Sequence, residues 1–310
     1  MRPDTSRPVF IIGGSRTGST MLQTILSKSP EISLTDEIQF RSPWWLHRDL
    51  VSDIKTHVGP LDKTGALDRL MELLYSGIPA GWFWSASERL LDRDMLYSEL
   101  SRGPLTIRSI FHSILTVHAH KRQRARIGAK FPMHYSYTQQ LLNWYPNCLL
   151  IHTTRNPKAV YASQAAKYIM PVQNFVSRSF LRFRQFVHIN FQTTWTARLH
   201  KQLRNLPNYQ LLRYEDLVLD PERKIRQLCD FLDIEFHSEM LSPKQFGSSF
   251  DSIGRDRHGI ERSSLDRWRS SISPLTAKTM DICHRRAFRI LGYSTDSNTQ
   301  INIDSNFKPE

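Results

Sequence analysis

A glycine-rich segment near the N-terminus constrains the fold of this chain more than any other feature. Residues 9–12 form a short apolar run with β-branched side chains, which is typical of a buried strand in a parallel sheet. Three glycines follow at positions 13, 14 and 18, and they permit a tight loop with positive φ angles. An apolar helix is expected from Ser19 onward. A strand, a glycine loop and a helix N-terminus together predict an anion site, because the loop N–H groups converge and the helix dipole favours negative charge.

The segment differs from a nucleotide P-loop at one position. The spacing from Gly13 to Gly18, followed by Ser19 and Thr20, nearly matches G-x-x-x-x-G-K-[ST], but Ser19 stands in the place of the lysine. A cation occurs inside the loop instead, as Arg16. An NTPase without the lysine loses its contact to the β- and γ-phosphates. The loop therefore predicts a site for a phosphate-like group other than magnesium ATP, and a glycine-rich turn without a ligand is the alternative.

The loop sequence Gly-Ser-Arg-Thr-Gly-Ser-Thr, followed by Met-Leu, resembles that of a known enzyme family. It is similar to the 5′-phosphosulfate loop of sulfotransferases that use 3′-phosphoadenylyl sulfate (PAPS). The resemblance is greatest to the branch that contains tyrosylprotein and many microbial sulfotransferases. It implies that PAPS is the sulfuryl donor, that no metal is needed, and that the loop binds the donor through Arg16, Thr17, Gly18, Ser19 and Thr20.

A second segment of the resemblance follows the apolar strand expected at 148–153. Arg155 lies just past its end, and Ser163 comes eight residues later on an expected helix. An arginine fork suits a phosphate monoester. The resemblance implies that Arg155 and Ser163 bind the 3′-phosphate of PAPS and that Lys167 adds a further basic group. The alternative is an exposed arginine and a helical serine that faces solvent.

The resemblance also implies the catalytic residues. Glu37 has the position of the family's catalytic base, and a carboxylate there can take the proton of an acceptor hydroxyl. Asp36 could replace it, or both carboxylates could cap the next helix. Lys130, at the end of an expected strand, would stabilise the departing phosphate together with Arg16. His134 is the second candidate for the base, and Lys130 could also be an ordinary residue at the end of a strand.

Two C-terminal segments complete the resemblance. Tyr214, in the segment 212–221, is expected to contact the nucleotide. The polar loop 242–264 carries several basic residues and corresponds to the part that closes over the adenosine 3′-phosphate in relatives. In all, the resemblance covers residues 8–37, 127–167, 209–233 and 255–293.

The order of elements predicts an α/β fold. Strands expected at 9–12, 31–35, 127–131, 148–153 and 209–214 alternate with helices, so a mostly parallel sheet with helices on both faces is expected. This is a P-loop-like three-layer fold in a single domain of residues 1–310. Residues 38–105 are expected to be a helical insertion on the acceptor side, whose tryptophans belong mainly to the core. Residues 172–206 predict one long helix or two, and 294–310 a flexible tail.

The net charge of +13 adds information about partners. It predicts an anionic partner such as a nucleotide, an acidic glycan or an anionic membrane surface. Arginines spread along the whole chain disfavour nucleic acid, which needs a clustered patch. Three cysteines at irregular spacing form no metal or disulfide pattern, and no leader or spanning segment is evident. A cytoplasmic enzyme is therefore expected.

These observations lead to one functional prediction with alternatives. The chain is expected to transfer a sulfuryl group from PAPS to a hydroxyl, in line and without a metal. A sugar hydroxyl of a glycan or glycolipid is the first candidate acceptor, because of the tryptophan-rich insertion and the basic surface. Protein tyrosine and small alcohols or phenols are the alternatives. A P-loop kinase or NTPase, or a non-catalytic anion binder, remains as a function of another class.

Overall fold

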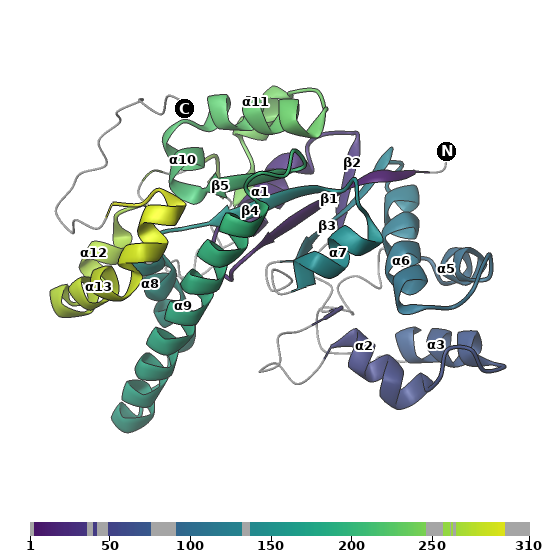
Figure 1. Cartoon of the computed structure of the whole chain (residues 1–310), viewed down its shortest axis with the longest axis horizontal. Helices are drawn as coiled ribbons and strands as arrows, with labels where there is room; N and C mark the ends of the chain where they lie inside the picture. The colour runs from purple at the N-terminus through teal and green to yellow at the C-terminus, as the bar shows by residue number, and fades with distance from the viewer. Residues whose placement is uncertain are drawn as a thin grey trace. The chain divides into compact units, whose positions relative to one another are not determined.

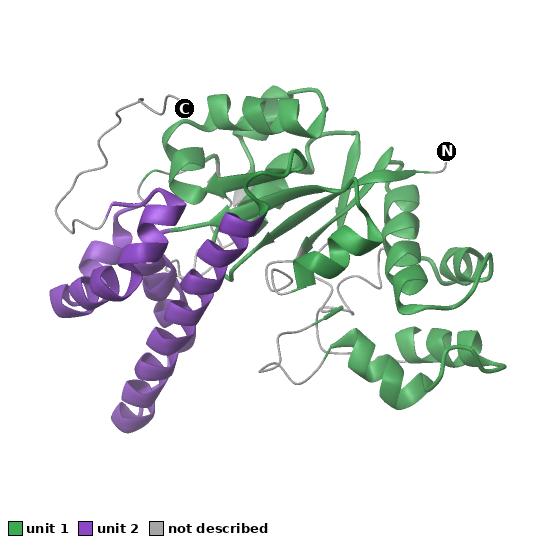
Figure 2. Cartoon of the chain, in the orientation of Figure 1, with its two compact units in different colours: residues 1–155, 203–262 green, residues 156–202, 263–310 purple. Residues whose placement is uncertain are grey.

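The computed structural model describes residues 3–35, 40–41, 49–75, 91–131, 137–245, 257–260, 262 and 265–294. The chain divides into two compact units (Figure 2). Unit 1 comprises residues 1–155 and 203–262, and unit 2 comprises residues 156–202 and 263–310.

The centre of unit 1 is a five-stranded parallel sheet with the strand order β2-β3-β1-β4-β5 (Figure 1). The strands are β1 (Asp4–Gly13), β2 (Ile32–Thr35), β3 (Arg126–Phe131), β4 (Leu149–Thr154) and β5 (Tyr209–Arg213). All five were predicted. Strand β1 begins earlier than its apolar run, because residues 4–7 are mostly exposed and polar and carry no signal of burial.

Alternate residues of β1 face opposite sides of this sheet, as the strand geometry requires. Val9 and Ile11 pack in a core with α1 (Ser19–Leu26) and α11 (Pro221–Leu232). Phe10 points to the other side, where its ring centroid lies 6.1 Å from that of Phe111 on α6 (Ile107–Lys121) and 5.5 Å from that of Tyr145 after α7 (Thr138–Trp144). The predicted arrangement, a parallel sheet with helices on both faces, is confirmed.

The region predicted as a helical insertion contains helices in its described part. These are α2 (Leu50–Asp53), a π-helical turn (Ile54–Val58), α3 (Ala66–Tyr75) and α5 (Arg93–Leu100). The first two were not predicted, because a four-residue helix capped by the Asp49 side chain has no measurable periodicity. Phe40 is a core residue, with its ring centroid 4.8 Å from that of Phe111. The tryptophans at 44, 45, 82 and 84 lie outside the described residues.

The rest of unit 1 consists of short elements near its C-terminal end. They are α10 (Tyr214–Leu219), a 3₁₀ helix (Ser238–Leu241) and a two-stranded antiparallel sheet of β6 (Lys244–Gln245) and β7 (Arg257–His258).

Unit 2 is helical. Its elements are α8 (Pro157–Tyr168), most of α9 (Phe175–Leu203), α12 (Arg267–Ser271) and α13 (Pro274–Leu291). Asn156 caps α8 with Pro157 in its first turn, and Gly292 ends α13 with a left-handed φ of 74°. Of the two possibilities left open for residues 172–206, the structure has one long helix.

Candidate functional site

The predicted donor-binding residues of unit 1 follow neighbouring strands of its sheet. Gly13, at the end of β1, pairs with Thr153 of β4, and Ile11 pairs with Lys130 of β3. Arg155 follows β4 directly. The carboxyl ends of parallel strands meet at one edge of the sheet, where α/β folds bind their ligands. The structure therefore brings the glycine loop, Lys130 and Arg155 to the same edge.

The loop after β1 has the backbone that an anion site requires. Arg16 has a φ of 66° and Gly18 a φ of 93°, so both are in the left-handed region. Such residues turn neighbouring N–H groups toward one side of a loop. Gly18 is also the N-cap of α1 and offers no side-chain acceptor, and the first turn of α1 has no acidic residue. An anionic ligand suits these first-turn N–H groups and the positive end of the helix.

A pair of buried threonines joins the loop to β4. The Thr17 hydroxyl donates to the Gly14 carbonyl at 2.8 Å and lies 2.7 Å from the Thr153 hydroxyl. The Thr153 hydroxyl lies 3.2 Å from the Ile12 carbonyl, so its single proton is shared between that carbonyl and the Thr17 oxygen. Both side chains are almost fully buried. The Thr17 side chain therefore holds the loop against the sheet, and its contact with the donor stays a prediction.

Tyr214 connects the loop to Arg155. A Cβ on Gly18 would overlap the ring of Tyr214, so this position needs glycine for space as well as for its φ angle. On the same ring, the Arg155 guanidinium carbon lies 4.1 Å from the ring centroid. This is a cation–π contact. One aromatic ring therefore separates the loop from the arginine that follows β4.

Lys130 reaches the other flank of the loop. Its ammonium group donates to the Thr20 hydroxyl at 3.4 Å, and the side chain is buried. A buried cation beside the positive end of α1 suits an anionic ligand at this end of the helix. The Gln23 amide, further along α1, donates to the carbonyls of Leu34 and Thr35 at the end of β2. These contacts fix the end of β2 close to α1.

Several predicted site residues cannot be placed in this geometry. Glu37, Asp36 and His134 lie outside the described residues, as do parts of the basic loop 242–264. Ser163 and Lys167 belong to α8 of unit 2, where Ser163 is buried and Lys167 is exposed. The ammonium of Lys167 lies 5.3 Å from the ring centroid of Tyr168. Burial of Ser163 excludes the alternative in which this serine faces solvent.

Sequence reasoning missed two residues that shape the site, Thr153 and Gln23. The signal for Thr153 was a hydroxyl near the end of the strand that follows the apolar run 148–151; the structure places it opposite the first loop glycine. The signal for Gln23 was a polar residue on the otherwise apolar face of α1. The contacts of either residue can be recognised only once the strand order is known.

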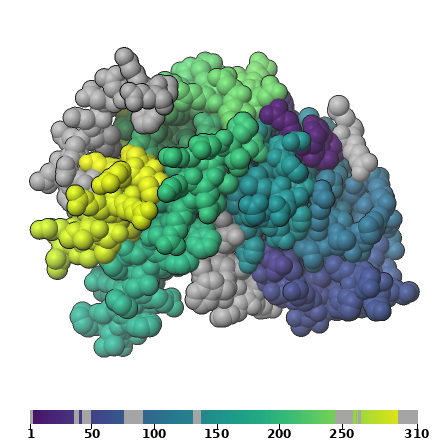
Figure 3. All heavy atoms as spheres, in the orientation of Figure 1, coloured from purple at the N-terminus to yellow at the C-terminus, as the bar shows by residue number. Residues whose placement is uncertain are grey.

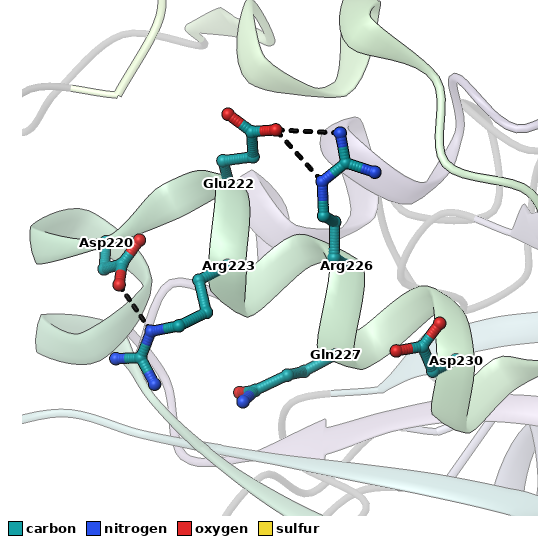
Figure 4. Close-up of a pocket in the computed structure, with 6 residues that line it drawn as sticks. All are labelled: Asp220, Glu222, Arg223, Arg226, Gln227 and Asp230. Carbon is teal, nitrogen blue, oxygen red and sulfur yellow. Dashed lines mark hydrogen bonds and ion pairs between the residues drawn. The ribbon is translucent and has the colours of Figure 1, made fainter.

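A shallow, open hollow lies elsewhere, on α11 (Figure 4). Asp220, Glu222, Arg223, Arg226, Gln227 and Asp230 line it, with a volume of about 400 Å³. Its charges pair within the helix: Arg223 with Asp220, and Arg226 with Glu222. Surface pairs of this kind are already satisfied and contribute little. We therefore assign no ligand to this hollow.

Within the described part of the chain, no group of three or more His, Cys, Asp or Glu side chains is placed to hold a metal ion. None of its helices combines the length and the apolar character that crossing a membrane requires.

Comparison with known proteins gives consistent matches. The model of the sulfotransferase family matches residues 8–238. An uncharacterized protein of Aquifex aeolicus is 24% identical over 278 residues. The match covers 86% of this chain but 31% of that protein, so the chain spans about a third of the length of this relative. The omega-hydroxy-beta-dihydromenaquinone-9 sulfotransferase Stf3 of Mycobacterium bovis is 23% identical over 83% of this chain and 78% of its own length.

Two solved structures share the fold. The sulfotransferase domain from the curacin biosynthetic pathway has a TM-score of 0.56 at 17% identity, covering 94% of this chain and 99% of that domain. The sulfotransferase domain of the Synechococcus PCC 7002 olefin synthase has a TM-score of 0.51 at 21% identity, covering 93% of this chain and 98% of that domain.

Proposed function

The chain belongs to the sulfotransferase family, and on that premise we propose that it moves a sulfuryl group from PAPS to an acceptor hydroxyl by metal-free in-line transfer. The observation that carries the proposal is the contact series Gly18–Tyr214–Arg155 in unit 1. It supports a ligand with one anionic group at the loop and a second at Arg155. PAPS carries phosphate groups on both its 5′ and 3′ oxygens and fits this requirement.

The loop is proposed to bind the 5′-phosphosulfate through the N–H groups of residues 16–20 and the side chains of Arg16, Ser19 and Thr20. Arg155 binds the 3′-phosphate as a planar fork, and Tyr214 positions that fork by packing against it. Ser163 and Lys167, on α8 of unit 2, stay predictions as donor-binding residues. PAPS supplies the activated sulfuryl group.

The reaction needs a base and a stabilised leaving group. Glu37 is proposed to take the proton of the acceptor hydroxyl as its oxygen bonds to sulfur. Arg16 and Lys130 then stabilise the negative charge that collects on the 5′-phosphate as the sulfur–oxygen bond to it breaks. The position of Glu37, two residues past the end of β2, supports this role, because β2 ends at the same edge of the sheet as β3. His134 is the second candidate base.

The acceptor is proposed to be a hydroxyl of a glycan or of a lipid. A glycan or glycolipid was the first candidate from the sequence. The name of the Stf3 relative adds a hydroxylated prenyl quinone as a second lipid class. Protein tyrosine and small alcohols or phenols are the alternatives. The three cysteines, all free and two of them buried, fit the cytoplasm as the proposed location.

Donor binding can be tested by isothermal titration with adenosine 3′,5′-bisphosphate. We expect saturable binding that Arg155→Ala weakens at least tenfold, because charge-assisted hydrogen bonds contribute about 1.5–3 kcal/mol. Arg102→Ala is the matched control, since Arg102 is exposed and paired with Glu99. No binding by the wild type, or equal binding by Arg155→Ala, would contradict the proposal. Magnesium-dependent binding of ATP would favour a kinase or NTPase instead.

Transfer can be tested with PAPS radiolabelled in its sulfuryl group. The enzyme is incubated with host lipids, glycans and proteins, which are then separated and counted. Label in the lipid or glycan fraction that Glu37→Gln abolishes is the expected result. Label in protein alone would contradict the proposed acceptor, and loss of transfer in a His134→Asn variant but not in Glu37→Gln would assign the base to His134.

A further inference from the structure

The N-terminal half of α9 carries apolar side chains that face solvent. Phe175, Phe180, Phe183 and Val187 are each at least half exposed, with Phe183 at 66%. Within unit 2, this end of α9 extends beyond α8, α12 and α13 (Figure 2). The helix also forms part of the surface drawn in Figure 3. Scattered exposed apolar residues are ordinary, but a cluster of large ones on one element marks an interaction site.

These residues form a continuous stripe along one face of the helix. Val176, Phe180, Phe183, Val187 and Phe191 are exposed and follow one another at intervals of three or four residues, which places them on one side of an α-helix. Further along α9, the positions that bury their side chains in unit 2, such as Ile189 and Thr196, lie on the opposite side of the helix. The stripe is therefore not the face with which α9 packs in its own unit.

The same stripe continues as positive charge. At the next three- and four-residue intervals come Thr194, Arg198 and Lys201, all exposed, and the exposed Arg184 flanks the apolar part. Helix α9 contains no acidic residue. The absence extends along the chain, because no Asp or Glu occurs between Glu99 and Glu215.

We propose that this stripe of α9, Val176 to Lys201, docks on an anionic lipid surface. A helix that lies in the membrane interface buries apolar side chains at the boundary of the acyl chains and places its arginines and lysines among the headgroups. Phenylalanine is well suited to the first role, and the exposed Arg184, Arg198 and Lys201 to the second.

Charge favours a lipid surface over a second copy of this chain. The intervals of the stripe would also suit a helix pair, but two copies of α9 would bring cations together without any carboxylate on either helix to pair with them. An anionic membrane neutralises all of these cations at once. Such docking needs neither a sulfuryl donor nor an acceptor, so it goes beyond the proposed function and can succeed or fail independently of it.

The experiment is cosedimentation of the full chain with vesicles. One set contains phosphatidylcholine alone, and the other an equimolar mixture of phosphatidylcholine and phosphatidylglycerol. We expect binding to the anionic vesicles that is at least tenfold tighter than to the neutral ones and that weakens as salt is raised. Binding that does not distinguish the two vesicle types would overturn the role of the cations, and protein that stays in the supernatant with both would overturn the proposal.

Paired variants separate the two halves of the stripe. Phe180→Ser with Phe183→Ser should weaken binding to anionic vesicles at least tenfold by removing two apolar anchors. Arg198→Gln with Lys201→Gln should weaken it roughly twentyfold and reduce its salt dependence. Leu275→Ser with Ile282→Ser is the matched control, because these side chains on α13 are at least as exposed as Phe180 and Phe183. Unchanged binding by both α9 variants would refute the docking role, whatever the control shows.

Sedimentation velocity of the same proteins tests whether the stripe instead binds a second copy of this chain. We expect the wild type and the Phe180/Phe183 variant to have the same oligomeric state. A wild-type dimer that this variant dissociates, together with no binding to vesicles, would assign the stripe to an interface between copies and overturn the proposal. Circular dichroism of each variant shows whether α9 remains folded.

Discussion

The ring of Tyr214 occupies the space that a side chain on Gly18 would need. The two residues come from opposite parts of the chain, one from the loop after β1 and the other from the start of α10. Glycine at position 18 therefore serves three purposes. It allows a φ of 93°, it caps α1, and it admits the aromatic ring that supports Arg155.

The first prediction concerns Gly18→Ala. A Cβ there adds left-handed strain and pushes Tyr214 away, so we expect the free energy of unfolding to fall by about 1–3 kcal/mol. Binding of adenosine 3′,5′-bisphosphate should weaken as well. Urea unfolding measures the first effect and titration calorimetry the second. Gly103→Ala is the control, because a Cβ at Gly103 meets no atom within 4 Å. Equal behaviour of the two variants would show that the close approach of Tyr214 is unimportant.

The second prediction separates the ring of Tyr214 from its hydroxyl. Tyr214→Phe keeps the surface on which the Arg155 guanidinium rests, and we expect nucleotide affinity within about threefold of the wild type. Tyr214→Leu removes the cation–π contact and frees the arginine, so affinity should fall roughly tenfold. Calorimetric titration of both variants with adenosine 3′,5′-bisphosphate measures these affinities. A large loss in Tyr214→Phe would mean that the hydroxyl itself binds the ligand.

The elements around this site were predictable from local patterns, whereas the contacts between them were not. The apolar run 9–12, the loop glycines and the expected strand at 127–131 carry periodicity and composition signals within a few residues. The meeting of Thr17 with Thr153, or of Gly18 with Tyr214, depends on the strand order β3-β1-β4-β5. That order is set by packing across the whole sheet. The strand order cannot be read from a single sequence. Tyr214 was therefore expected to contact the nucleotide, but its contacts with Gly18 and Arg155 were not predicted.

The third prediction concerns the buried threonine pair. Thr17→Val or Thr153→Val leaves the other hydroxyl with one partner fewer, which should cost about 1–2 kcal/mol of unfolding free energy. The double variant should cost less than the sum of the single ones, because the two hydroxyls share one hydrogen bond. A complete double-mutant cycle in urea measures this coupling. Strict additivity would mean that the 2.7 Å contact contributes nothing to stability.

The fourth prediction concerns the ion pair inside unit 2. The Lys158 ammonium lies 2.6 Å from an Asp281 carboxylate oxygen, and both side chains are buried. Lys158→Met or Asp281→Asn leaves one buried charge without its partner, so each should cost about 3–5 kcal/mol. The pair Lys158→Met with Asp281→Leu should cost less than either single change. Thermal unfolding followed by circular dichroism tests this, and single variants as stable as the wild type would contradict it.

The fifth prediction is a loss of stability in mild acid. Burial lowers the pKa of His118 to about 3 and that of His284 to about 4. The unfolded chain binds a proton on each imidazole below about pH 6.5, while the folded chain does not, so stability falls as the pH drops from 6.5 toward these values. Between pH 7.5 and 5.5 each histidine should remove about 1.4 kcal/mol from the unfolding free energy.

Urea unfolding of His118→Gln at both pH values should show a smaller decrease in the unfolding free energy than the wild type. The exposed His57→Gln serves as the control and should keep the full decrease. An unchanged pH dependence in His118→Gln would show that this imidazole is protonated in the folded state.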